Sequence, residues 1–165
     1  MSIFRKLFLV GVLLTLSACG GGGLFGNNAS GAGGANSGLA GDPTSPAYFQ
    51  QTIGDRVLFA VNQSGLSDEA QNVLNAQAEW LAANPDYSAV IEGHADEQGT
   101  REYNLALGAR RANSVRDYLI SRGVAGSRLK VVSYGKERPI ELCSEESCYR
   151  QNRRAVTVLS GGLTG

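Results

Sequence analysis

The stretch from Val90 to Ala112 restricts the possible folds of this chain more than any other. It begins with the β-forming pair Val90 and Ile91, continues through a polar loop, and ends in a segment with helical spacing. Such a strand–loop–helix unit brings the C-terminal end of a strand next to the N-terminus of a helix. Ligands of open α/β sheets usually bind at that place.

Two opposite charges in this stretch predict a small binding site. Asp96 lies in the loop, and Arg111 follows Asn104 and Leu107 on one face of the next helix. We expect Asp96 and Arg111 to face one another across a shallow pocket. A carboxylate accepts hydrogen bonds from an ammonium group, and a guanidinium donates two parallel hydrogen bonds to a carboxylate. The pocket would therefore suit a zwitterion, such as the end of an amino acid.

Composition excludes one class of partner. The chain has 165 residues, no formal net charge and 42 % apolar residues. This balance is ordinary for a globular domain, and it lacks the basic excess that neutralises phosphates. We therefore expect no nucleic-acid partner. We also expect no cofactor.

The N-terminus predicts export and lipidation. Residues 1–18 have a charged start and a short apolar run, as in a signal peptide, and they lead into Leu16-Ser17-Ala18-Cys19. That sequence resembles the lipobox of bacterial lipoproteins. The resemblance implies that Cys19 carries a diacylglyceryl thioether and an acylated amine, and that Gly20 after it favours the outer membrane. An ordinary signal peptide with an incidental cysteine is the alternative.

Residues 19–46 predict a flexible tether rich in Gly, Ala, Asn and Ser, because they show no apolar period. Residues 47–165 predict one α/β domain. We expect strands at Asp55–Val61, Ser88–His94, Leu129–Tyr134 and Arg154–Ser160, and helices after Ser67 and from Glu102 to Arg122. The order β-α-β-α-β-β predicts a two-layer α/β sandwich, with two helices on one face of a mixed four-stranded sheet. The core stripe of the second helix is expected to be Leu105, Gly108, Ala112, Val115 and Leu119.

Four motifs resemble one family, the OmpA-like peptidoglycan-binding domain. They are the loop Gly93–Thr100, the helix signature from Asn104 through Arg111 to Leu119, the turn Val132–Pro139, and the entry Asn152–Val156 to the last strand. The resemblance covers roughly residues 50 to 160. It implies the fold of the OmpA C-terminal domain.

The resemblance also implies a function. It predicts a non-catalytic clamp on the diaminopimelate of peptidoglycan stem peptides, in a periplasm-facing protein that links the outer membrane to the cell wall. Lipid-anchored relatives also bind TolB of the Tol complex on an overlapping surface, and take part in outer-membrane constriction at division. The residues that match the family's site are Asp96, Arg111, Asn104, Leu107, Phe59, Ala60 and, more weakly, Arg154. Ala60 departs from relatives, which commonly have Asp there, so only its backbone can bind.

Several alternatives stay open from sequence. Asp96 and Arg111 could form a purely structural ion pair, and the function could be that of a Tol-independent structural lipoprotein or a cell-wall amidase. His94 could hold a metal together with Glu92, Asp96 and Glu97, but the expected strand alternation and the lack of a second His or Cys at ligand spacing favour no metal. A motor stator, which uses the same domain, would need a transmembrane helix in place of the lipobox.

Two further groups of residues complete the predictions. Cys143 and Cys148 are expected to form a disulfide in the oxidising periplasm, with free thiols as the alternative and no binding role assigned. The arginines at 150, 153 and 154 are interpreted as a solvated or salt-bridged patch, with one of the three near the ligand as the alternative. We expect Asp96→Ala and Arg111→Ala to leave the fold intact and to abolish binding to sacculi.

Overall fold

The computed structural model of the chain describes residues 41–161. The predictions for the signal segment, for Cys19 and for most of the tether lie outside the described residues. The elements are α1 (Pro46–Tyr48), the π-helical turn η1 (Phe49–Gly54), β1 (Arg56–Leu58), α2 (Asp68–Ala83), β2 (Tyr87–His94), α3 (Arg101–Ser121), the 3₁₀ turn η2 (Gly126–Arg128), β3 (Leu129–Gly135), α4 (Glu146–Asn152) and β4 (Arg154–Gly161).

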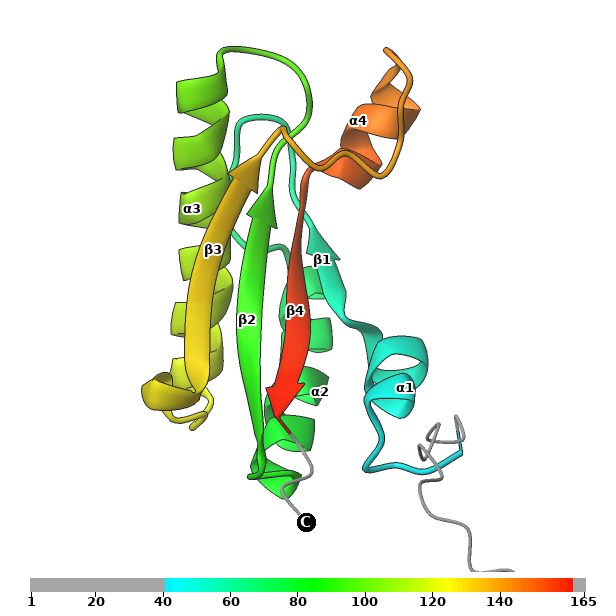
Figure 1. Cartoon of the computed structure of the whole chain (residues 1–165), viewed down its shortest axis with the longest axis vertical. Coiled ribbons are helices and arrows are strands. Elements are labelled where there is room, and N and C mark those ends of the chain that lie inside the picture. Colours follow the sequence, from blue (N-terminus) through cyan, green and yellow to red (C-terminus); the bar gives the residue numbers. More distant parts are fainter. Residues whose placement is uncertain (1–40, 162–165) are drawn as a thin grey trace, which may run out of the picture. The chain divides into compact units, whose positions relative to one another are not determined.

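The four strands form one mixed sheet in the order β1-β4-β2-β3. Strands β2 and β3 are parallel, and β4 runs antiparallel to both β1 and β2. Helices α2 and α3 cover one face of this sheet (Figure 1). The predicted two-layer α/β sandwich is confirmed, including the antiparallel last strand.

Capping side chains begin the two long helices as the sequence requires. The Ser67 hydroxyl accepts from the backbone N–H of Ala70, and the Thr100 hydroxyl accepts from that of Tyr103. After α3, Gly123 takes a φ of +96°, a conformation that favours glycine. Because α2 follows β1 and α3 follows β2, the two helices start at the end of the sheet where these strands finish.

The core lies between the sheet and the two helices. Its largest fully buried apolar side chains are Phe49, Leu74, Leu81, Ile91, Leu119 and Val115. The stripe predicted for α3 needs one correction, because Leu105 is 45 % exposed. The buried face is turned toward Asn104, Leu107 and Arg111, which lie in it and not at its margin. Two polar side chains thus occupy positions that an apolar stripe would fill.

A close backbone contact joins α3 to β2. A Cβ atom on Gly93 would overlap the carbonyl oxygen of Gly108, and one on Gly108 would collide with Ser133 and with the Gly93 backbone. The prediction that Gly108 marks close packing against a neighbour is confirmed. This contact holds the start of α3 against the C-terminal end of β2.

Three segments differ from the sequence-based expectation. Residues 42–46, assigned to the tether, contact the domain: Ser45 is 4 % exposed, and the Pro43 carbonyl accepts from Trp80 Nε1 at 2.7 Å. Strand β1 ends at Leu58, because the chain turns away after Phe59, with Gln63 N–H donating to the Ala60 carbonyl. The loop expected after β3 contains the short helix α4.

Candidate ligand-binding site

The candidate site lies at the end of the sheet where β1 and β2 finish and β4 begins. Three segments meet there: the β1–α2 loop, the β2–α3 loop and helix α4 (Figure 1). The sheet order brings β1 and β2 to either side of β4, so loops distant in sequence share one end.

Arg111, on helix α3, connects two of these segments. Its Nε donates to the Gln63 carbonyl at 2.8 Å, its Nη2 to the Ala60 carbonyl at 3.1 Å, and its Nη1 to the His94 carbonyl at 2.8 Å. Its side chain is fully buried, and its guanidinium carbon lies 5.2 Å from the centre of the Phe59 ring. Arg111 therefore fixes the β1–α2 loop to the end of β2.

The charge on Arg111 is held in an unfavourable setting. Burial lowers the pKa of Arg111 to about 10, and the nearby charge of Asp96 acts in the opposite direction. The guanidinium stays protonated at neutral pH. Arg111 is therefore a buried cation that feels the charge of the Asp96 carboxylate, the partner that the sequence predicts for it.

Asp96 is 7 % exposed and is bonded to groups other than Arg111. Its Oδ1 accepts from the Gln98 N–H at 3.2 Å, and its Oδ2 accepts from Arg153 Nη1 at 3.1 Å. The structure thus brings Asp96 and Arg111 into one neighbourhood, while the direct ion pair of Asp96 is with Arg153.

Arg153 is the residue of this neighbourhood that sequence reasoning did not single out from the three arginines at 150, 153 and 154. It is 3 % exposed, its Nε donates to the Phe59 carbonyl at 3.2 Å, and both of its terminal nitrogens contact the Glu146 carboxylate. The hydrogen bond to Glu146 raises the pKa of Arg153, and that bond lowers the pKa of Glu146. The interpretation of the three arginines as one patch is therefore incomplete. The register that sets the Arg153 carbonyl opposite the Phe59 N–H was the missing signal.

Asn104 and Leu107 support the loop from α3. Asn104 is 1 % exposed, and its Nδ2 donates to the Gln98 carbonyl at 2.8 Å, which closes the β2–α3 loop over the helix. Leu107 is 3 % exposed in the same helix face. The side-chain oxygen of Asn104 is buried and has no hydrogen-bond partner within residues 41–161.

A cleft of about 620 Å³ opens beside these groups, between the end of β1 and α4. Phe59, Ala60 and Arg153 lie on its wall, so the cleft reaches the arginine that pairs with Asp96, while Asp96 and Arg111 themselves do not line it. The other lining residues are Leu58, Gln63, Gly65, Leu66, Ser67, Glu69 and Arg150. This opening gives a ligand access to Arg150 and Arg153.

Arg154 belongs to a different group of side chains. It donates to the Asn152 and Arg138 carbonyls, at 3.4 and 3.2 Å. Its charge and that of Arg138 act on His94, which is 2 % exposed. Burial first, and then these two arginines, lower the pKa of His94 to about 4. Within the part of the chain that the structure describes, neither nitrogen of His94 has a hydrogen-bond partner.

Within residues 41–161, no group of three His, Cys, Asp or Glu side chains could hold a metal ion. No helix in the same range has both the length and the apolar character needed to cross a bilayer. The predicted disulfide between Cys143 and Cys148 is present, just before and within α4.

The arrangement favours binding of a charged ligand. A buried carboxylate pairs with an arginine on the wall of a cleft, and its charge acts on a second arginine that fixes loops. Such a set offers an acceptor and several donors to a zwitterion.

This chain is similar to known proteins in both sequence and fold. The sequence model of the OmpA family matches residues 58–153. The chain is 56 % identical to the peptidoglycan-associated lipoprotein of Rhizobium meliloti (strain 1021) over 122 residues, which are 74 % of this chain and 69 % of that protein. It is 38 % identical to the protein of the same name from Haemophilus influenzae over 152 residues, which are 92 % of this chain and 95 % of that protein.

Solved structures share the fold. The crystal structure of the peptidoglycan-associated lipoprotein from Burkholderia pseudomallei matches with a TM-score of 0.65 and 38 % identity, over 73 % of this chain and 98 % of that one. The C-terminal domain of Helicobacter pylori MotB matches with a TM-score of 0.61 and 21 % identity, over 66 % of this chain and 85 % of that one. The second likeness concerns the fold alone.

Proposed function

The chain belongs to the OmpA family, and on that premise we propose that it is a lipid-anchored, non-catalytic protein that binds peptidoglycan through the diaminopimelate of the stem peptide. The relatives cited above are named for association with peptidoglycan. The observation that carries the proposal is the single neighbourhood of Asp96, Arg111 and Arg153 beside an open cleft.

The side chain of diaminopimelate ends in an ammonium and a carboxylate on one carbon. Asp96 accepts from the ammonium, and Arg111 donates to the carboxylate. A guanidinium has five N–H groups, and the described hydrogen bonds of Arg111 use three of them. Because Arg111 is fully buried, the ligand reaches it only when the β1–α2 loop shifts at Ala60 and Gln63.

The other matched residues supply the surroundings of this clamp. Phe59 and Leu107 form apolar walls, Ala60 presents backbone, and Asn104 holds the β2–α3 loop. Arg154 is the weakest member, since its hydrogen bonds go to carbonyls beside His94 and not to the Asp96 group. We propose Arg153 in its place as the second arginine of the site.

The binding of the full-length chain to purified sacculi tests this proposal. We expect co-sedimentation with diaminopimelate-type sacculi and none with lysine-type sacculi, because lysine lacks the second carboxylate. Asp96→Asn removes the acceptor charge and should lower binding at least a hundredfold. Asp117→Asn is the control, because Asp117 is an exposed carboxylate on the same helix as Arg111. Equal binding of both sacculus types, or of Asp96→Asn and wild type, would reject the clamp.

An analysis of the released material separates this function from a cell-wall amidase. Sacculi incubated with the protein should yield no soluble muropeptides, since the proposed role is binding alone. Release of peptides or glycans above the level of untreated sacculi would instead favour the enzyme.

The anchor and the address form the second part of the proposal. Residues 1–18 act as a lipoprotein signal, Cys19 carries the lipids, and the segment from residue 19 toward 46 connects the outer membrane to the domain in the periplasm. Cys19→Ala should abolish palmitate labelling and membrane fractionation. Normal labelling of that variant would contradict the lipobox assignment.

TolB is the proposed protein partner, at a surface that overlaps the peptidoglycan site and serves outer-membrane constriction at division. Exposed apolar side chains at this end of the molecule support a protein-binding surface: Val61 is 47 % exposed, Tyr103 43 % and Leu142 86 %. If the surfaces overlap, soluble muropeptide should displace TolB from the chain. An absence of TolB binding would favour the Tol-independent structural lipoprotein.

A further inference from the structure

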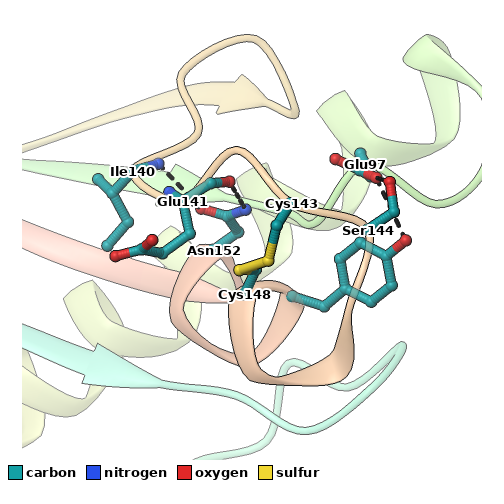
Figure 2. Close-up of a disulfide and its surroundings, with 8 residues drawn as sticks. Glu97, Ile140, Glu141, Cys143, Ser144, Cys148 and Asn152 are labelled. Carbon is teal, nitrogen blue, oxygen red and sulfur yellow. Dashed lines mark hydrogen bonds between the residues drawn. A yellow bond between two sulfur atoms is a disulfide. The ribbon is translucent and has the colours of Figure 1, made fainter.

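A small covalent ring lies against the loop that carries Asp96. The disulfide joins Cys143 to Cys148, with Cα atoms 5.8 Å apart, and encloses Ser144, Glu145, Glu146 and Ser147. Figure 2 shows this ring with Glu97 of the β2–α3 loop on one side. On the other side, Asn152 bonds the backbone of Ile140 and Glu141, which attaches the preceding loop to the end of α4.

Two contacts from this segment reach Glu97 directly. Its Oε1 accepts from Ser144 Oγ at 3.0 Å and from Tyr149 Oη at 3.2 Å. Ser144 lies inside the ring, and Tyr149 is the residue directly after Cys148, which closes the ring. One carboxylate oxygen of the loop is therefore held by two donors whose backbone positions depend on the ring.

A third contact reaches Asp96 through Arg153. Glu146, also inside the ring, contacts both terminal nitrogens of Arg153, and Nη1 of Arg153 donates to Asp96 Oδ2. Asp96 and Glu97 are adjacent, so the ring holds two consecutive side chains of the loop by separate routes. Ser144 and Glu146 are themselves exposed, and little apolar packing fixes them.

We propose that the ring Cys143–Cys148 is a positioning device for ligand binding, with Ser144 and Glu146 as positioning residues that hold Glu97 and, through Arg153, Asp96. This inference rests on the proposed binding role of Asp96. Exposed side chains in an open loop would have to be ordered at each binding event, and a closed ring is already ordered. A loop this short constrains the unfolded chain little, so the effect of the ring falls on affinity more than on global stability.

The first test is the double variant Cys143→Ser/Cys148→Ser of the full-length chain, in detergent, with diaminopimelate-type sacculi as the probe. We expect binding about tenfold weaker and faster hydrogen exchange of residues 95–100, with a midpoint of thermal unfolding within a few degrees of wild type. A phosphine reductant should weaken the wild type to the same extent and leave the double variant unchanged. Wild-type affinity in the double variant would overturn the inference.

The second test separates Glu146 from its neighbour. Glu146→Gln should weaken binding severalfold, because it releases Arg153 from the ring. Glu145→Gln removes the same charge from the same ring at an exposed position and should bind as wild type does. Equal affinities of the two variants would overturn the positioning role of Glu146.

The outcomes distinguish this inference from the proposed function. If wild type binds sacculi, Asp96→Asn does not, and the ring variants bind fully, only the positioning role fails. If wild type does not bind, the proposed function fails, and hydrogen exchange of residues 95–100 still decides whether the ring orders the loop.

Discussion

The two ends of the sheet each contain an arginine that bonds to backbone carbonyls. At the start of β2, Arg128 donates to the carbonyls of Leu81, Asn84 and Tyr87, at 2.6 to 3.0 Å. At the end of β2, Arg111 bonds three carbonyls in the same way. Both side chains connect elements that are far apart in sequence.

Their settings differ in burial and in charge. Arg128 is half-buried, whereas Arg111 is fully buried and lies among Asp96 and Arg153. The same bonding pattern therefore serves loop closure at one end, and at the other it also maintains a charged site. Bonds to carbonyls do not identify a binding arginine; its charged neighbours do.

The largest expected effect comes from removing each arginine in turn. Arg111→Ala empties a fully buried site beside Phe59 and leaves the buried carbonyl of His94 unpaired, so it should lower the free energy of unfolding by about 4 kcal/mol. Arg128→Ala removes a side chain that is only half-buried, so water can enter in its place, and the variant should cost about 1–2 kcal/mol. Urea unfolding of the full-length variants measures both. Equal losses would remove the distinction between the ends.

The full burial of Arg111 changes one expectation from the sequence. The sequence predicts that Arg111→Ala leaves the fold intact, whereas the loss of a fully buried side chain argues against that outcome. Loss of sacculus binding by this variant alone would not prove contact with a ligand. Asp96→Asn, which keeps the size of a loop side chain, is the cleaner test of binding.

The second prediction compares a glycine at each end. Gly108→Ala forces a Cβ into Ser133 and the Gly93 backbone, and should cost about 3 kcal/mol. Gly126→Ala meets only the tip of Ile120, at 3.3 Å, and should cost about 0.5 kcal/mol or less. Thermal unfolding measures the difference. A tolerated Gly108→Ala would show that α3 can move away from β2.

The third prediction concerns pH and His94, the only histidine in the chain. Its folded pKa of about 4 lies below the ordinary value of 6.5, so folding favours the neutral ring. The stabilisation is complete above pH 6.5 and is lost as the pH falls from 6.5 toward 4, with about 2 kcal/mol of it lost by pH 5. Urea unfolding between pH 7 and pH 5 should show this slope in wild type and a smaller one in His94→Gln. Parallel curves would contradict it.

Much of the fold was predictable because its signals are local. The caps Ser67 and Thr100, the glycine after α3 and the alternation of β2 are each written in a few neighbouring residues. Helix α4 was missed because its seven residues carry no apolar period. Its position depends on Asn152 and the disulfide, which act through tertiary contacts.

The site was predictable in part for the same reason. Asp96 and Arg111 are linked by one strand–loop–helix unit, so their proximity follows from local geometry. Arg153 and Arg154 are adjacent, and successive residues of extended chain point to opposite sides. Only the pairing of β1 with β4 decides which of them joins Asp96, and that register is a long-range property.

The smallest expected effect lies at the end of the sheet away from the site. Trp80→Phe keeps the aromatic contacts with Phe49 and Tyr87, at 4.9 and 5.1 Å, and removes the hydrogen bond to the Pro43 carbonyl. We expect the free energy of unfolding to fall by about 1 kcal/mol, because phenylalanine has no N–H to donate to the Pro43 carbonyl. Circular dichroism during unfolding measures this loss. Sacculus binding should stay at the wild-type level, since the contact is remote from Asp96. A variant that unfolds normally but binds weakly would show that the segment at residues 42–46 influences the opposite end of the sheet.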